Sequence, residues 1–90
     1  MRAGVALEVE KAFRTLKAKE AQVVQKERAE ALSAEVMEKA KLMYKNGLMT
    51  MTELLIKEAE LLRARAELIK ARFDRTLAAA TLTIATGNDL

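Results

Sequence analysis

The 90-residue sequence contains no histidine, cysteine, proline or tryptophan, and it has only three glycines, two phenylalanines and one tyrosine. Without cysteine the chain can form no disulfide bond. Without proline it lacks the residue that most strongly interrupts a helix. Alanine, leucine, glutamate, lysine and arginine dominate instead, a composition typical of a long helix or coiled coil rather than of a sheet protein.

The missing histidine also removes the commonest general base and metal ligand. The single serine, Ser33, lies among Ala, Leu and Glu, so we interpret it as a surface or seam residue of a helix. Four of the methionines lie toward the middle of the chain: Met37, Met43, Met49 and Met51. Thioethers can bind copper(I), but no cysteine or histidine accompanies them, so flexible packing is the favoured interpretation. We therefore expect no enzymatic activity, catalytic residue, cofactor or metal site.

The charged residues are mixed in sign, with 16 basic and 13 acidic side chains and a net charge of +3. A nucleic-acid module usually concentrates its basic charge and carries aromatics for stacking, so we expect no nucleic-acid partner. No apolar run approaches the roughly 20 residues of a membrane-spanning helix, so we expect no such segment. Glu8 and Glu10 interrupt the apolar N-terminal residues, so we expect no targeting signal in this chain.

The first periodic segment predicts a helix over residues 5–45. Val9, Leu16 and Val23 follow one another seven residues apart, which is helical spacing. After Lys26 the apolar pattern resumes, with Leu32 and Ala40 between the members of a new column: Ala29, Val36 and Met43. Residues 25–28 are less apolar, so we expect the seam between helices to be thin and built of alanine there.

The second periodic segment predicts a helix over residues 51–86, with Gly87 as its cap. Three columns with seven-residue spacing run along it: Leu54, Leu61 and Leu68; Leu55, Leu62 and Ile69; Ala59, Ala66, Phe73 and Ala80. Together they make an apolar face wider than a two-stranded coiled coil requires, so we expect this helix to contact more than one neighbour.

Local signals between the two segments predict a turn at residues 46–50. Asn46 and Gly47 tolerate the left-handed backbone that ends many helices. Thr50 is a good N-cap, and Glu53 three residues later completes a capping box. The fold class predicted is therefore all-α, a single domain over residues 1–90 in the form of a long antiparallel two-helix coiled-coil hairpin. Because its interior is thin, we expect a homo-oligomer or a place in a larger protein.

The order of these features resembles the last α-helical hairpin of TolC-type outer-membrane efflux channels. The turn segment, residues 44–55, resembles the tip of that hairpin, with an aromatic residue, a polar spacer and glycine before an acidic-apolar helix start. Residues 7–13 resemble the start of its ascending helix. Residues 64–74 and 77–87 resemble the family's "LxxARxxY…L…ATG" ending. The resemblance covers residues 6–87.

This resemblance implies an export duct. Family members are trimers whose hairpins form a tapered α-barrel across the periplasm, beneath a β-barrel in the outer membrane. The duct opens when it meets a periplasmic adaptor and an inner-membrane pump. The resemblance implies that the adaptor docks on the tip and that two residues lie near the aperture. The tip residues are Asn46, Gly47, Leu48, Met49 and Thr50, and the aperture residues are Tyr44 and Glu53.

The sequence departs from the family pattern in two ways. Met49 stands where a basic residue can occur and Ile56 where a second acid can occur, so we expect a more apolar closure. A complete member also has a second hairpin, β-strands and a signal sequence. We therefore expect this chain to be a fragment of such a channel. The alternative is a free-standing coiled-coil module that self-associates into a four-helix bundle; a hairpin of the adaptor itself is a third interpretation.

Overall fold

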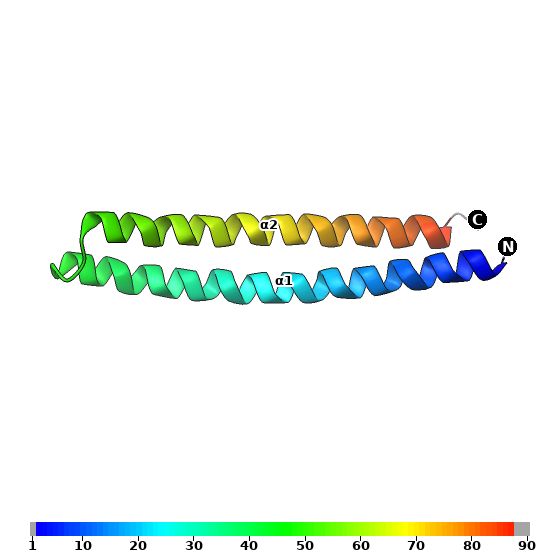
Figure 1. The fold of residues 1–90 in the computed structure, drawn as a ribbon, viewed down its shortest axis with the longest axis horizontal. Coiled ribbons are helices and arrows are strands. Elements are labelled where there is room, and N and C mark those ends of the chain that lie inside the picture. The colour runs from blue at the N-terminus through cyan, green and yellow to red at the C-terminus, as the bar shows by residue number, and fades with distance from the viewer. Residues whose placement is uncertain (1, 88–90) are drawn as a thin grey trace. The chain divides into compact units, whose positions relative to one another are not determined.

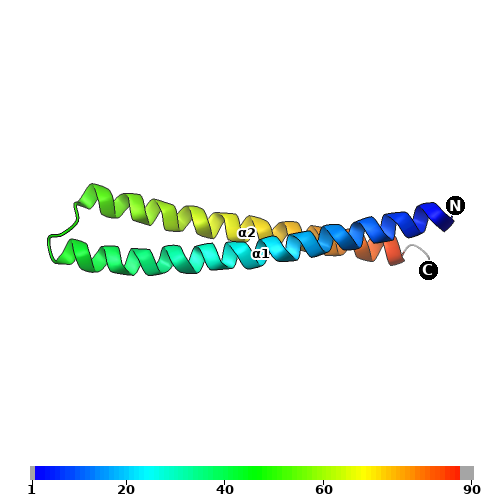
Figure 2. The same cartoon turned by 60° about the horizontal axis from the view of Figure 1, so that its bottom comes forward.

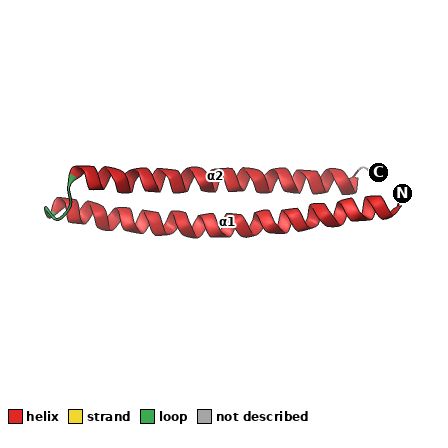
Figure 3. Ribbon diagram, in the orientation of Figure 1, coloured by secondary structure: helices red, strands yellow, loops and turns green. Residues whose placement is uncertain are grey.

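The structure is a computed structural model that describes residues 2–87, with side chains described from Ala6 onward. Two α-helices occupy nearly all of this part of the chain (Figure 1). Helix α1 is Arg2–Lys45 and α2 is Met51–Gly87. No strand occurs among the described residues, as Figure 3 shows. The predicted two-helix hairpin is confirmed; α1 begins three residues earlier than predicted, and α2 includes Gly87 itself.

The chain divides into two units, and in each of them a stretch of α1 lies alongside a stretch of α2 (Figures 1 and 2). The turn unit is Gln25–Ile69 and contains the connection between the helices. The end unit combines the described residues up to Val24 with those from Lys70 onward. Both units are antiparallel helix pairs with a thin interior.

The interior of each unit is an inner seam whose residues alternate in steps of three and four. Such spacing keeps one stripe of each helix facing its partner in a coiled coil. In the turn unit the seam residues are Lys26, Glu30, Ser33, Met37 and Ala40 on α1, with Leu54, Lys57, Leu61, Ala64 and Leu68 on α2. In the end unit they are Val9, Ala12, Leu16, Lys19 and Val23, with Ala71, Arg75, Ala78, Leu82 and Ala85.

The predicted seam is right for the first half of α1 and, apart from the buried Ala40, wrong for the second. Val23 is buried, whereas Val36 and Met43 are exposed, because the seam continues with Lys26 and Glu30. These two side chains reach across to α2: Lys26 Nζ lies 3.1 Å from Glu67 Oε2, and Arg65 Nε lies 3.4 Å from Glu30 Oε1. The seam at this level is therefore polar rather than built of alanine.

The turn is closed by backbone hydrogen bonds on the α1 side. Leu48 N–H donates to Met43 O at 2.8 Å and Gly47 N–H donates to Tyr44 O at 3.1 Å. This pair of bonds is the Schellman motif, which requires a left-handed residue after the helix. Gly47 supplies it with φ of 75°. Glycine adopts this conformation without the Cβ clash that other residues meet.

The start of α2 is capped by Thr50. Its Oγ1 accepts a hydrogen bond from Glu53 N–H at 3.1 Å, and its carbonyl accepts the first helical bond from Leu54 N–H at 3.0 Å. This is the N-cap half of the predicted capping box. Met49 and Leu54, which flank the cap at the positions of a hydrophobic staple, are both half-buried.

Candidate functional site

A second apolar row runs along α2 on the side away from α1. We call it the outer row. Its members are Leu55, Ala59, Leu62, Ala66 and Ile69 in the turn unit, followed by Phe73, Leu77, Ala80 and Ile84 in the end unit. All of them are exposed; Leu62 is 57% exposed and Ile69 66%. The outer row contains two of the three columns that the sequence predicted for this helix.

The outer row lies nearly opposite the inner seam around the helix axis. Ala66, for example, is two residues from Ala64 and two residues from Leu68, both of which are buried. Two residues of an α-helix turn through about 200°. The row also alternates steps of three and four, apart from two consecutive steps of four from Ile69 to Phe73 and from Phe73 to Leu77. It therefore has the spacing of a second coiled-coil seam.

Helix α1 carries a shorter exposed apolar row in the turn unit. Its members are Ala29, Leu32, Val36 and Met43. Ala29 follows Lys26 by three residues, so the row lies on the side of α1 that pairs with Glu67. Leu62 and Ile69 lie three residues before and four residues after Arg65, which pairs with Glu30 instead. Each helix of the turn unit thus offers apolar surface to a neighbour, on different sides of the pair.

The predicted tip and aperture residues are gathered at the turn by backbone bonding. Leu48 is 69% exposed, although it occupies the position where Schellman motifs often make an apolar contact. Gly47 has open space around the position of a Cβ, so its role in the fold comes from its backbone angle. Tyr44 is 38% exposed, and its carbonyl oxygen accepts a hydrogen bond from the Gly47 N–H. Glu53 is exposed in the first turn of α2, where its negative charge interacts favourably with the helix dipole.

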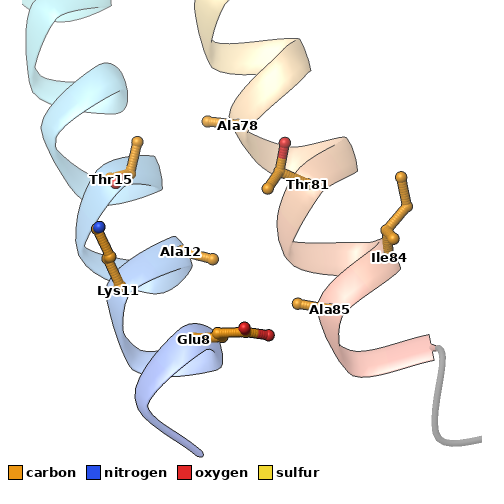
Figure 4. A pocket seen from close by; sticks show the side chains of 8 residues that line it. All are labelled: Glu8, Lys11, Ala12, Thr15, Ala78, Thr81, Ile84 and Ala85. Atoms are coloured by element: carbon orange, nitrogen blue, oxygen red, sulfur yellow. The ribbon is translucent and has the colours of Figure 1, made fainter. Parts of the chain in front are cut away.

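The end unit contains an open groove of about 420 Å³ between its helices (Figure 4). It is lined by Glu8, Lys11, Ala12, Thr15, Ala78, Thr81, Ile84 and Ala85. Ala12, Ala78 and Ala85 belong to the inner seam, and their small side chains leave the space unfilled. The groove is therefore a product of alanine packing between two helices.

The charged side chains form pairs along the surface. Arg14 Nη2 lies 2.9 Å from Glu10 Oε1, one helical turn earlier on the same side of α1. Lys57 pairs with Glu60 at 3.6 Å. Within residues 2–87 no group of three or more acidic side chains is placed to hold a metal ion. Neither helix, over its described length, is long and apolar enough to cross a membrane.

Comparisons with known proteins return no relative. No protein-family model matches the chain, and neither does any curated protein or solved structure.

Proposed function

We propose that the chain is one helical hairpin of the periplasmic α-barrel of a trimeric outer-membrane efflux channel, forming part of its wall and its adaptor-docking tip. The outer row of α2 is the observation that carries this proposal. A helix in the wall of a barrel has one neighbour on each side, so it needs two apolar seams that face in nearly opposite directions. Helix α2 has this arrangement.

On α2 the position of the outer row disfavours the four-helix bundle, whereas the exposed row of α1 adjoins its inner seam. In such a bundle the two nearest neighbours of each helix lie at about a right angle, so their contact stripes adjoin on one broad face. Ala59 and Ala66 lie nearly opposite the inner seam instead. A closed bundle would leave them in water. A row or ring of helices would cover them.

The outer row predicts which surface change breaks the assembly. Ala66 and Ala31 are both exposed alanines of the turn unit, one in the outer row and one on α1. Aspartate at Ala66 places a charge in a surface that a neighbour would bury, where an unpaired charge is costly. We expect Ala66→Asp to prevent trimer formation, measured on native gels of detergent-extracted membranes, and Ala31→Asp to leave it intact. Equal effects of the two changes would contradict the assignment of the outer row.

A direct test of the parent protein uses fractionated source cells and an antibody against this hairpin. A band several times larger than 10.0 kDa in the outer-membrane fraction is the expected result. A band near 10.0 kDa outside the membranes would instead support an independent coiled-coil module. This measurement separates a channel hairpin from a free-standing one whatever its contacts are.

The tip is the second part of the proposal, with a periplasmic adaptor and its inner-membrane pump as partners. Leu48 is the tip's most exposed apolar side chain, so we expect it to make the largest apolar contact with the adaptor. Leu48→Asp should abolish co-purification of the adaptor and leave the helix content unchanged. Thr52→Asp is the matched control, because it adds the same charge to the exposed first turn of α2. If the Leu48 variant captured the adaptor at the normal level, Leu48 would not be part of the docking surface.

A further inference from the structure

Basic side chains border the middle of the outer row on both sides. The members of the row over residues 62–73 are Leu62, Ala66, Ile69 and Phe73. On one side are Arg63 and Lys70, each one residue after a member of the row. On the other side are Arg65 and Arg72, each one residue before a member. One residue turns an α-helix through about 100°, so the two pairs lie on opposite sides of the row. We call these four exposed residues the basic flanks.

The acidic side chains in this part of α2 lie farther around the helix, toward α1. Glu67 and Asp74 are the only acids over residues 62–75, and both are half-buried. Glu67 Oε2 lies 3.1 Å from Lys26 Nζ of α1. Glu67 Oε1 also lies 3.7 Å from Arg63 Nε, but the Arg63 side chain is 84% exposed, so water weakens this pair. Every exposed charge on α2 over residues 62–75 is therefore positive.

The exposed rows of this chain are poorly suited to neutralise the basic flanks. The row of α1 has Arg28, Glu35 and Lys39 beside it, so its own surroundings are net basic. The first turns of the outer row have a single acid beside them, Glu58. A second copy laid against the basic flanks with either row would bring mainly like charges together, which is unfavourable. The preferred neighbour of the outer row is therefore not another copy of this hairpin.

We propose that the neighbour of the outer row is an α-helix of different sequence, with acidic side chains on both sides of its own apolar seam. The inference rests on the proposed function, which assigns a neighbouring helix to the outer row, and it adds the chemistry of that helix. Charges beside a coiled-coil seam set the choice of partner. A helix fits this row better than a lipid surface does, because Ala66 at its centre lets another helix approach closely. A lipid-binding face is filled with large apolar side chains instead.

The test offers two designed helical peptides to the full 90-residue chain at the same time. The peptides share a leucine and alanine seam with one central cysteine, and they differ in having glutamate or lysine on both sides of it. The chain has no cysteine, so Ala66→Cys places a single thiol in the outer row. After equilibration in a glutathione buffer at low salt, mass spectrometry gives the ratio of the two mixed disulfides. We expect the glutamate peptide to be captured roughly tenfold more than the lysine peptide, because several weak surface pairs act together.

Two controls separate this preference from a general attraction between a basic chain and an acidic peptide. Ala31→Cys places the thiol on an exposed position of α1 in the same unit, with charges of both signs nearby. Its capture ratio should be close to one. High salt should lower the ratio measured with Ala66→Cys, because salt screens exposed charges.

The basic flanks are tested by neutralising them in the Ala66→Cys chain. Arg63→Gln together with Lys70→Gln should lower the capture ratio severalfold. Lys11→Gln together with Lys17→Gln is the matched control, since it removes the same charge from exposed positions of α1. It should leave the ratio unchanged. Circular dichroism checks that the helix content of the two double variants is equal.

Three outcomes would overturn the inference. One is a capture ratio near one for Ala66→Cys. Another is a disulfide-linked chain dimer that exceeds both peptide products, which would make a second copy the preferred neighbour. The third is co-sedimentation of the chain with phosphatidylglycerol vesicles that is lost with Arg63→Gln and Lys70→Gln, which would assign the basic flanks to a lipid surface. The channel proposal fails separately, through a band near 10.0 kDa outside the membranes.

Discussion

Leu61 and Leu62 are neighbours in sequence with the same side chain and opposite situations. Leu61 lies in the inner seam and is 8% exposed, whereas Leu62 lies in the outer row and is 57% exposed. The hairpin buries only one of the two apolar stripes of α2. Seven-residue spacing therefore identifies stripes that are able to pack, and the number of neighbours decides which stripes are covered.

A charge placed at each of the two leucines should have the most different effects. Leu61→Asp puts a carboxylate into the inner seam, where its desolvation costs several kcal/mol. We expect loss of most helix content in the turn unit, measured by circular dichroism. Leu62→Asp should keep the helix content of the dilute chain and lower only the sedimenting mass at high concentration. Equal loss of helix content in both variants would show that the outer row is also needed within the single hairpin.

A larger side chain at an alanine also distinguishes the inner seam from the outer row. Ala64 is 9% exposed in the inner seam, whereas Ala66 in the outer row is exposed. Ala64→Leu overpacks a filled site, which costs about 1–3 kcal/mol. Ala66→Leu should leave the urea midpoint of the dilute chain nearly unchanged. A higher midpoint for Ala64→Leu than for the parent chain would mean that the seam at this level holds unfilled space.

Backbone strain at the turn should lower the stability of the hairpin without acting on either the inner seam or the outer row. Gly47 has φ of 75°, and an L-residue there costs about 1–2 kcal/mol. Gly47→Val is expected to lower the unfolding free energy by this amount in thermal denaturation. Asparagine tolerates the left-handed region, so Gly47→Asn should lose less. If the two variants melted together, the Schellman turn would not limit the stability of the hairpin.

The smallest effect is expected at the polar level of the inner seam. Lys26 and Glu67 are 40% and 44% exposed in their side chains, so water screens their interaction. Such pairs contribute about 0–1 kcal/mol. Glu67→Gln should therefore change the melting temperature only slightly, and less at high salt than at low salt. A large, salt-independent loss would show that the pair is more desolvated than its exposure indicates.

The fold was predictable because its signals are local. Asn46 and Gly47 end one helix, and Thr50 with Glu53 begins the next, so the turn depends on residues close in sequence. The leucine columns of α2 identified its inner seam and showed that a second stripe existed. Apolar spacing does not show which column faces α1. That depends on the position of α1 beside α2.

The second half of α1 was not predictable from apolar spacing. Lys26 and Glu30 occupy seam positions because their charged ends reach partners on α2. Apolar spacing assigns charged residues to the solvent-exposed side of a helix. It therefore predicted Ala29 and Val36 as seam residues instead. The partners Glu67 and Arg65 are far away in sequence, and only the pairing of the two helices brings them close. The role of the tip and aperture residues stays a prediction that rests on the resemblance.

The closed turn has a consequence for how the chain folds. The Schellman bonds and the Thr50 cap join residues at most five positions apart, so forming them closes a very short loop. Pairs farther from the turn close longer loops and lose more chain entropy before any contact forms. Folding should therefore start at the turn and proceed residue by residue toward the termini. In φ-value analysis, substitutions near Met37 should score high and those near Val9 low.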